Sequence, residues 1–371
     1  MMPAQFDPDA PMATDELDDA ALAAADAGAL RRRWPVILAL FLLAPITAEV
    51  LSGSTPLLEF ARHPVLAVIN LPLYGCGVLL VREVARRRGL GWAGVLWLGA
   101  AYGIWEEGVV INTWANPWAP VICSAQRQGL CDYGRVGGVS VLWALSLTAF
   151  HAVVSITIPI LLVELARPRL APLPWLTRGG LRWCVAGELF VLLLGLLLSL
   201  GAFRDHGQLG PPWRPYAIEL ALMAACVALA LLPRWPASRG SSGALPSLWT
   251  LRLLGCLALT LDLFLPNLEK GLRVPYQAAM AINVAVLALA LWRLATWSRR
   301  AGWGQRHILA LATGVLGFLI VLWDPLLELA GQASGKPTRG TAVVAALYLI
   351  GLIALARVVA RRERHDPVFA R

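Results

Sequence analysis

Residues 91–111 read GWAGVLWLGAAYGIWEEGVVI, a run long enough to cross a membrane but interrupted by Glu106 and Glu107. A membrane-spanning helix needs about 20 predominantly apolar residues. A carboxylate near the middle of such a helix costs roughly 2.5–3.5 kcal/mol on insertion, and ionisable groups at such positions mark functional sites by default. The stretch therefore predicts both a membrane helix and a polar site inside the membrane.

The composition of the whole chain indicates the same class of protein. Hydrophobic residues make up 58% of the 371 positions and charged residues 15%, whereas about a quarter of an ordinary soluble domain is charged. The excess of arginine over lysine, with abundant Ala, Gly and Pro, is typical of a GC-rich bacterial genome. We therefore expect an all-α, multi-pass protein of the inner (plasma) membrane, whose partner is the lipid bilayer and not nucleic acid.

Ten apolar stretches have the length of a membrane crossing. They lie at about 34–52, 64–82, 91–111, 139–164, 183–202, 215–232, 249–265, 275–296, 307–329 and 341–360. Between them we expect connecting loops, with no separate soluble domain.

The basic residues predict the orientation of these ten spans. With the N-terminus in the cytoplasm, 23 of the 32 lysines and arginines fall in inner segments and 9 in outer ones. Cytoplasmic segments carry an excess of Lys and Arg. Ten spans with both termini in the cytoplasm satisfy this rule.

The ends of the chain predict a simple domain division. Residues 1–30 are acidic and Ala-rich, which is typical of a disordered tail and not of a cleavable signal peptide. Residues 31–362 form a single transmembrane domain, and 363–371 a short cytoplasmic tail. Cys123 and Cys131 share the longest outer loop, where an oxidising compartment would allow a disulfide; two free thiols are the alternative.

Helix rise converts position into depth in the membrane. By this count Glu106 and Glu107 lie in the outer part of the third span, and His151 lies near the middle of the fourth. The secondary polar candidates Glu49, Asp262 and Asp324 fall in the outer half as well, whereas Glu188 falls in the inner half.

Two short patterns predict how the third and fourth spans pack. Gly99 and Gly103 form a G-x-x-x-G step that suits close helix packing. Glu107 continues this stripe, so we expect Glu107 to face the neighbouring helix and Glu106 to point about 100° away. On the fourth span, Thr148 and Ser155 share the face of His151.

Glu106, Glu107 and His151 are thus the predicted catalytic set. One of two neighbouring carboxyl groups can keep its proton while the other acts as a base. A histidine beside them can stabilise an oxyanion, share a water or complete the ligand shell of a divalent metal. These groups serve hydrolysis and proton-coupled transport equally well.

The glutamate pair in the third span and the Phe150-His151 step in the fourth resemble the CAAX-protease and bacteriocin-processing (CPBP) family of intramembrane proteases. The resemblance covers about sixty residues and implies that Glu106 and Glu107 activate water while His151 assists. The motifs are incomplete. Ile111 and Leu147 stand where the family has an arginine and a phenylalanine, and no third motif is found.

Three functions remain open from the sequence. The first is an intramembrane hydrolase, best described as a protease, with Glu107 as general base, Glu106 as its partner and His151 as oxyanion stabiliser or ligand. The second is a proton- or cation-coupled transporter that uses the same acids. The third is a non-catalytic assembly or signalling protein. A substrate would be embedded in the membrane or reach the site from the outer side.

Overall fold

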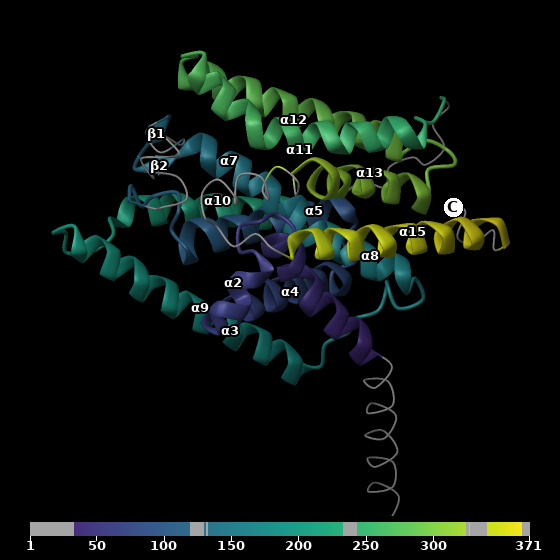
Figure 1. The fold of residues 1–371 in the computed structure, drawn as a ribbon, viewed down its shortest axis with the longest axis horizontal. Helices are drawn as coiled ribbons and strands as arrows, with labels where there is room; N and C mark the ends of the chain where they lie inside the picture. The colour runs from purple at the N-terminus through teal and green to yellow at the C-terminus, as the bar shows by residue number, and fades with distance from the viewer. Residues whose placement is uncertain are drawn as a thin grey trace, which may run out of the picture.

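The apolar runs form helices that lie side by side (Figure 1). The computed structural model describes residues 33–118, 130, 133–232, 243–323, 326 and 340–365. Among these residues, nine helices are long and apolar enough to cross a membrane: Arg33–Val50, Pro64–Arg87, Val141–Ala166, Arg178–Asp205, Trp213–Leu231, Leu248–Gly271, Tyr276–Ser298, Gln305–Trp323 and Thr341–His365. Each matches one predicted span, which confirms the all-α, polytopic membrane fold.

Five of these helices are α-helical along their whole length. They are α9 (Arg178–Asp205), α10 (Trp213–Leu231), α11 (Leu248–Gly271), α12 (Tyr276–Ser298) and α15 (Thr341–His365). The short helix α2 (Leu57–Arg62) precedes the second span. Side chains cap the N-termini of α9 and α11. The hydroxyls of Thr177 and Ser247 accept hydrogen bonds from backbone N–H groups in the first turns of these two helices.

The one predicted span that is not among these nine is the third, at 91–111. It also forms a helix of the right length, but it is less apolar than the other nine. Helix α5 (Trp92–Gly103) runs directly into the π-helical segment η3 (Ile104–Val110), which carries both glutamates. Most of this helix is buried, and it packs against the helices of the second, fourth and sixth spans. The helix with the costliest side chains therefore lies in the interior of the bundle, where protein and not lipid surrounds them.

Several spans change from α-helical to π-helical hydrogen bonding along their length. The second span consists of α3 (Pro64–Asn70), η2 (Leu71–Cys76) and α4 (Gly77–Arg87), and the fourth of α7 (Val141–Phe150), η5 (His151–Thr157) and α8 (Ile158–Ala166). The first span ends in η1 (Ile46–Val50), and α13 (Gln305–Gly317) continues into η6 (Phe318–Trp323). Such wide turns are rare and are often found at functional sites.

Prolines lie in or beside three of these segments. Pro45 directly precedes η1, Pro72 is the second residue of η2, and Pro159 follows η5. A proline has no N–H to donate and its ring displaces the carbonyl one turn earlier, so the regular α-helical ladder is interrupted. Segment η3 contains no proline.

The segments that were predicted to be cytoplasmic meet at one end of the bundle. Arg86 of α4 binds Glu164 of α8, and Arg362 of α15 donates to the carbonyl of Leu165. Three predicted inner segments are thus in direct contact.

The predicted outer segments meet at the opposite end. Asn112, just after η3, donates to the hydroxyl of Tyr216 on α10, and Tyr133 donates to the carbonyl of Val274 between α11 and α12. A small antiparallel hairpin of β1 (Arg135–Val136) and β2 (Val139–Ser140) lies at this end, away from the C-terminal end of α15 (Figure 1). The helices therefore alternate in direction as the ten-span prediction requires.

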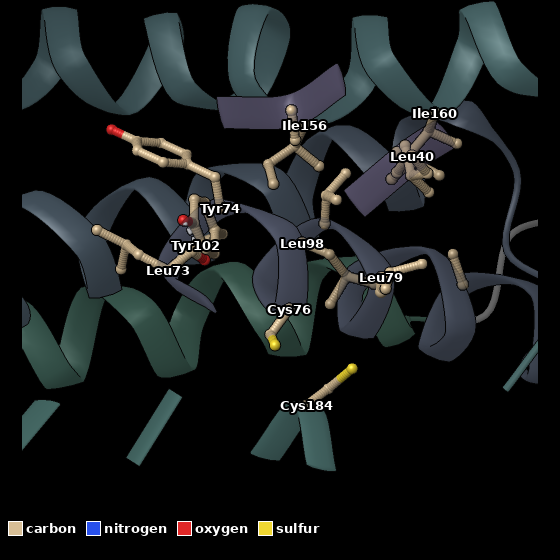
Figure 2. Close-up of a cluster of buried hydrophobic side chains, with 14 of the residues drawn as sticks. Leu40, Leu73, Tyr74, Cys76, Leu79, Leu98, Tyr102, Ile156, Ile160 and Cys184 are labelled. Carbon is tan, nitrogen blue, oxygen red and sulfur yellow. Dashed lines mark hydrogen bonds between the residues drawn. The ribbon is translucent and has the colours of Figure 1, made fainter. Parts of the chain in front are cut away.

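The core and the lipid-facing surface are both apolar. Buried residues of the first six spans form one large cluster, in which the side chains of Leu73, Leu98 and Ile156 come from three different spans (Figure 2). Helices α9 to α12 leave many large side chains exposed, including Trp183 and Leu198. Exposed apolar surface of this extent belongs in a lipid bilayer.

The first span contacts the last one. The hydroxyl groups of Thr47 and Tyr348 are 2.5 Å apart, although 301 positions separate them in the chain. The ninth span also contacts the turn after the first one, because the indole N–H of Trp323 donates to the carbonyl of Ser52 over 2.6 Å. The bundle is therefore closed by contacts between its two ends.

Candidate functional site

Glu106, Glu107 and His151 come together in the interior of the bundle. His151 Nε2 lies 2.9 Å from Glu106 Oε2 and 3.3 Å from Glu107 Oε1. The side chains of Glu106 and His151 are only 4% and 3% exposed, whereas that of Glu107 is 14% exposed. The cluster is therefore almost closed, and it is most open on the side of Glu107.

Close packing of the third and fourth spans holds these groups together. A Cβ at Gly103 would lie 2.9 Å from the Cβ of His151, and one at Gly99 would lie 3.0 Å from the Cα and carbonyl oxygen of Ala152. Both glycines face η5, as the G-x-x-x-G step predicts. Because neither carries a side chain, the backbones approach closely enough for the glutamates of η3 to reach the imidazole.

The predicted orientation of the glutamate pair is wrong in one respect. Glu106 does not point away from the neighbouring helix: it is the more buried of the two acids and makes the shorter contact with His151. The prediction assumed a regular α-helical turn of about 100° per residue. Segment η3 is π-helical, and a wider turn rotates the chain less per residue, so adjacent side chains diverge less.

His151 is fixed from both of its ring nitrogens. Its Nδ1 lies 2.8 Å from the hydroxyl oxygen of Ser155, and its Nε2 is hydrogen-bonded to Glu107 Oε1. Ser155 thus lies on the same face as His151 and contacts it, as predicted from the polar stripe. Thr148 does not, because its hydroxyl donates to the carbonyl of Ala144 in its own helix.

The two glutamates differ in how their oxygens are occupied. Glu107 accepts from His151 at one oxygen and from the hydroxyl of Thr113 at the other. Glu106 accepts from the hydroxyl of Tyr74 at Oε1 over 2.9 Å. Its Oε2 contacts His151 by distance but has no hydrogen-bonding geometry to any donor among the described residues. Glu106 Oε2 is therefore a buried acceptor that can still take a proton.

Tyr74 extends the cluster to a third carboxyl group. Its hydroxyl lies 2.6 Å from Glu49 Oε1 and 2.9 Å from Glu106 Oε1, and Glu49 also accepts from Thr55 over 2.6 Å. A phenol has a single O–H and can donate to only one carboxylate. The second short contact therefore requires that Glu49 or Glu106 carry a proton of its own and donate it to the phenol oxygen.

The result is a chain of polar contacts through four spans, in which hydrogen bonds form every link except the ion-pair contact between His151 and Glu106. It runs from Glu107 through His151, Glu106 and Tyr74 to Glu49, and each of these residues lies in a π-helical segment. The widened turns therefore coincide with the polar site.

Tyr74 and Thr113 were not predicted from the sequence. Tyr74 lies in the middle of an otherwise apolar span, two residues after Pro72, and no signal in the sequence singles it out from an unpartnered phenol. Thr113 follows Glu107 by six residues, a spacing that has no regular meaning in an α-helix. Only the wide turn of η3 and the helix end after it bring that hydroxyl back to the carboxylate.

The other predicted polar residues lie apart from this chain of groups or outside the described residues. Asp262 is on α11, where its backbone carbonyl accepts from Ser146, and no described hydrogen bond joins its side chain to His151. Glu188 on α9 accepts from the indole N–H of Trp105 over 2.8 Å. Asp324 lies outside the described residues, as do Cys123 and Cys131, so their roles stay predictions.

The three central side chains also form a set that suits a metal ion. One ligand atom from each of Glu106, Glu107 and His151 lies within 4.8 Å of the other two. Two carboxylates and an imidazole leave a fourth position open, as catalytic metal sites require. The buried Glu106 Oε2, which lacks a donor, fits this arrangement.

A sequence model of an uncharacterized membrane protein family matches residues 38–243, more than half of the chain. The chain belongs to this family. No curated protein and no solved structure matches it. The part of the chain that is shared with this membrane protein family contains Glu49, Tyr74, Glu106, Glu107 and His151, so the whole polar chain lies within it. The match supports a membrane protein and gives no support to the CPBP resemblance.

Proposed function

We propose that this protein is an intramembrane hydrolase that acts on a peptide bond within or beside the membrane. The observation that carries the proposal is the position of His151 Nε2, 2.9 Å and 3.3 Å from two buried carboxylates, one of which has an oxygen without a hydrogen-bond donor. General acid–base catalysis needs such groups within hydrogen-bonding distance of one another.

The geometry supports a different base from the one expected from the sequence. Both oxygens of Glu107 are occupied, by His151 and Thr113, whereas Glu106 Oε2 is not. Glu106 is therefore the general base, and Glu107 holds the imidazole in position. His151 keeps a proton on Nε2 when the hydroxyl of Ser155 donates to Nδ1.

The chemical steps follow from these roles. Glu106 Oε2 takes a proton from a water molecule, and the water oxygen bonds to the carbonyl carbon of the substrate. The N–H of His151, held in place by Glu107, also donates to the oxyanion, which a buried donor stabilises more strongly than water does. The carbon–nitrogen bond then breaks, and Glu106 returns the proton to the leaving nitrogen.

A metal ion is the alternative way to activate this water. Glu106, Glu107 and His151 would hold it, and the ion would lower the pKa of the bound water. The resemblance of the glutamate pair and Phe150-His151 to the CPBP proteases supports hydrolysis with or without an ion.

Membranes from cells that produce the wild-type chain or Glu106→Gln test the proposal. Mass spectrometry of protein N-termini should find new cleavage products with the wild type. In Glu106→Gln they should fall by about 10²–10⁴-fold, because the amide cannot accept the proton. Chelation of divalent ions before the assay separates the metal-dependent from the metal-free form of the reaction.

Glu188→Gln is the matched control. It changes another buried intramembrane glutamate in the same way but leaves His151 untouched, and an amide oxygen can still accept from Trp105. It should behave as the wild type. Identical N-terminal profiles for wild type and Glu106→Gln at equal membrane abundance would end the hydrolase proposal.

The link from Glu106 through Tyr74 to Glu49 favours proton-coupled transport as a second candidate. Hydrolysis needs no third carboxyl group, whereas a proton path across a membrane is built from such chains. Glu49→Gln separates the two. In liposomes that contain a pH-sensitive dye, it should abolish proton flux if the protein is a transporter, while leaving peptide cleavage largely intact if the protein is a hydrolase.

A further inference from the structure

A cavity of about 340 Å³ opens at the arginine-rich end of the bundle, away from the glutamate–histidine site. The end of α4, the start of α5, the end of α8 and the start of α13 surround it. Its lining is apolar at Leu161, Leu165 and Ile308 and polar at Arg86, Glu164 and Gln305. The volume lies at the lower end of the range of ligand pockets, roughly 300–1,000 Å³.

The charges at this cavity do not balance. Arg82 and Arg86 both bind the single carboxylate of Glu164, the first over 3.1 Å and the second through two nitrogens at 2.8 and 2.5 Å. The other nearby glutamate, Glu83, pairs with Arg87 over 2.8 Å. Three guanidinium groups thus share two carboxylates, which leaves one positive charge beside the cavity.

Arg362 adds a second positive charge. Its two terminal nitrogens donate to the carbonyl oxygens of Leu165 and Ala166 at the end of α8, over 2.7 and 3.1 Å. Carbonyl groups satisfy its hydrogen bonds but do not neutralise its charge. Arg306, by contrast, is paired with Glu363. The rim of the cavity therefore favours a ligand with negative charge.

One polar atom in the lining lacks a partner. The side-chain oxygen of Gln305 is buried and has no hydrogen-bond donor among the described residues. A buried acceptor without a donor costs about 1–3 kcal/mol. A ligand that brings a hydroxyl or amino hydrogen to this atom removes that cost.

We propose that the cavity binds the head group of an anionic phospholipid that carries hydroxyl groups, as phosphatidylglycerol does. The phosphate is attracted by the uncompensated arginine charge, a glycerol hydroxyl donates to Gln305, and the acyl chains follow Leu161 and Ile308 into the bilayer. A soluble anion would gain nothing from this apolar floor. Basic pockets between helices at a membrane surface are typical sites for anionic head groups.

Thermal unfolding of the full chain in detergent tests the proposal, with three lipids added as probes. Phosphatidylglycerol should raise the melting temperature with a saturable dependence on its concentration, and phosphatidylmethanol should do so less, because it has the same single negative charge but no head-group hydroxyls. Phosphatidylcholine, which has no net charge, should have no comparable effect. Equal stabilisation by phosphatidylcholine and phosphatidylglycerol would overturn the proposal.

Two variants locate the effect. Ala171→Trp fills the cavity without changing its charge, and it should weaken the response to phosphatidylglycerol by about tenfold or more, a difference of about 1.4 kcal/mol. Leu257→Trp, at an exposed position of α11, is the matched control and should respond as the wild type.

Gln305→Leu decides the result if Ala171→Trp does not fold. It keeps every arginine but removes the unpartnered amide oxygen, so the responses to phosphatidylglycerol and phosphatidylmethanol should become equal. A preference for phosphatidylglycerol that survives in Gln305→Leu, or a full response in folded Ala171→Trp, would place the lipid elsewhere.

Discussion

Tyr74 shows how much a single hydroxyl group can decide in the interior of a membrane protein. Its oxygen is shared by Glu49 and Glu106, at 2.6 and 2.9 Å. Without it, two carboxyl groups on different spans would each lose a partner in a region from which water is largely excluded. Hydrogen bonds to charged groups contribute about 1.5–3 kcal/mol, more than those between neutral groups.

We therefore expect Tyr74→Phe to lower the free energy of unfolding in mixed micelles by about 1.5–3 kcal/mol. Tyr102→Phe is the matched control, because the buried hydroxyl of Tyr102 donates to a backbone carbonyl, that of Leu73, over 2.8 Å. Its loss should be about 0.5–1.5 kcal/mol. Equal losses in the two variants would show that Tyr74 does not bridge the acids.

A double-mutant cycle measures the same bond directly. If Tyr74 binds Glu49, the effects of Tyr74→Phe and Glu49→Gln should not add, with a coupling energy of about 0.5–3 kcal/mol. Additive effects within about 0.5 kcal/mol would indicate that the two groups are independent.

At this scale the sequence predicts which ionisable residues matter better than it predicts what they touch. Glu106, Glu107 and His151 stand out because charge inside an apolar span is costly, and Glu49 follows from its depth. Tyr74 does not stand out, because a phenol is tolerated in a membrane helix with or without a partner. The different occupancy of the two glutamates depends on Thr113, which no periodicity connects to Glu107.

The third and fourth spans depend on small residues for their close approach. Gly99 faces the backbone of Ala152, so an added methyl group would meet atoms that cannot rotate away. Inserting a methyl group into a packed interface costs about 1–3 kcal/mol. Alanine also favours a helix over glycine by roughly 0.5–1 kcal/mol, and this gain must be separated from the crowding.

Gly99→Ala and Gly351→Ala separate the two effects. Gly351 is in the middle of α15 and has nothing within 4 Å of an added Cβ, so Gly351→Ala should leave stability unchanged or raise it. Gly99→Ala should lower the melting temperature in detergent and reduce the amount of protein in the membrane. Similar behaviour of the two variants would contradict close packing at Gly99.

The positions of the helices could be predicted from sequence, but their hydrogen-bonding pattern could not. Apolar length and turn residues locate the spans to within a few residues. The change from α-helical to π-helical turns depends on how each span packs, since prolines precede or follow some of these segments while η3 has none. The orientation of Glu106 was mispredicted for this reason.

The alternating directions of the helices lead to a prediction for the molecule as a whole. Because the predicted inner segments meet at one end and the outer ones at the other, the two termini should lie on the same side of the membrane. The excess of arginine at one end predicts that this side faces the cytoplasm, and we propose the bacterial inner membrane as the location.

Reporter fusions test this orientation. A reporter that is active only outside the cytoplasm should be active after Gly129 and inactive at the C-terminus, and a cytoplasmic reporter should give the opposite result. A fusion after Ser238, in a predicted inner loop, is an internal control and should match the C-terminus. Activity of the same reporter after Gly129 and at the C-terminus would exclude ten spans.

The class of fold is therefore readable from composition and the spacing of apolar runs, because lipid imposes strict length and polarity on each helix. Which helix occupies the centre is not readable in the same way. The third predicted span is the least apolar of the ten and is still mostly buried, because its glycines and glutamates are acceptable only where other helices surround them.

The contact between Thr47 and Tyr348 has a consequence for the order of assembly during synthesis. A ribosome adds about 5–20 residues per second, and 301 positions separate the two hydroxyls. Between about 15 and 60 seconds therefore pass before the earliest helix can meet its last neighbour. During that interval the nascent chain holds Glu49 and Tyr74 in a bundle that is still open on one flank, and only the emergence of α15 closes it.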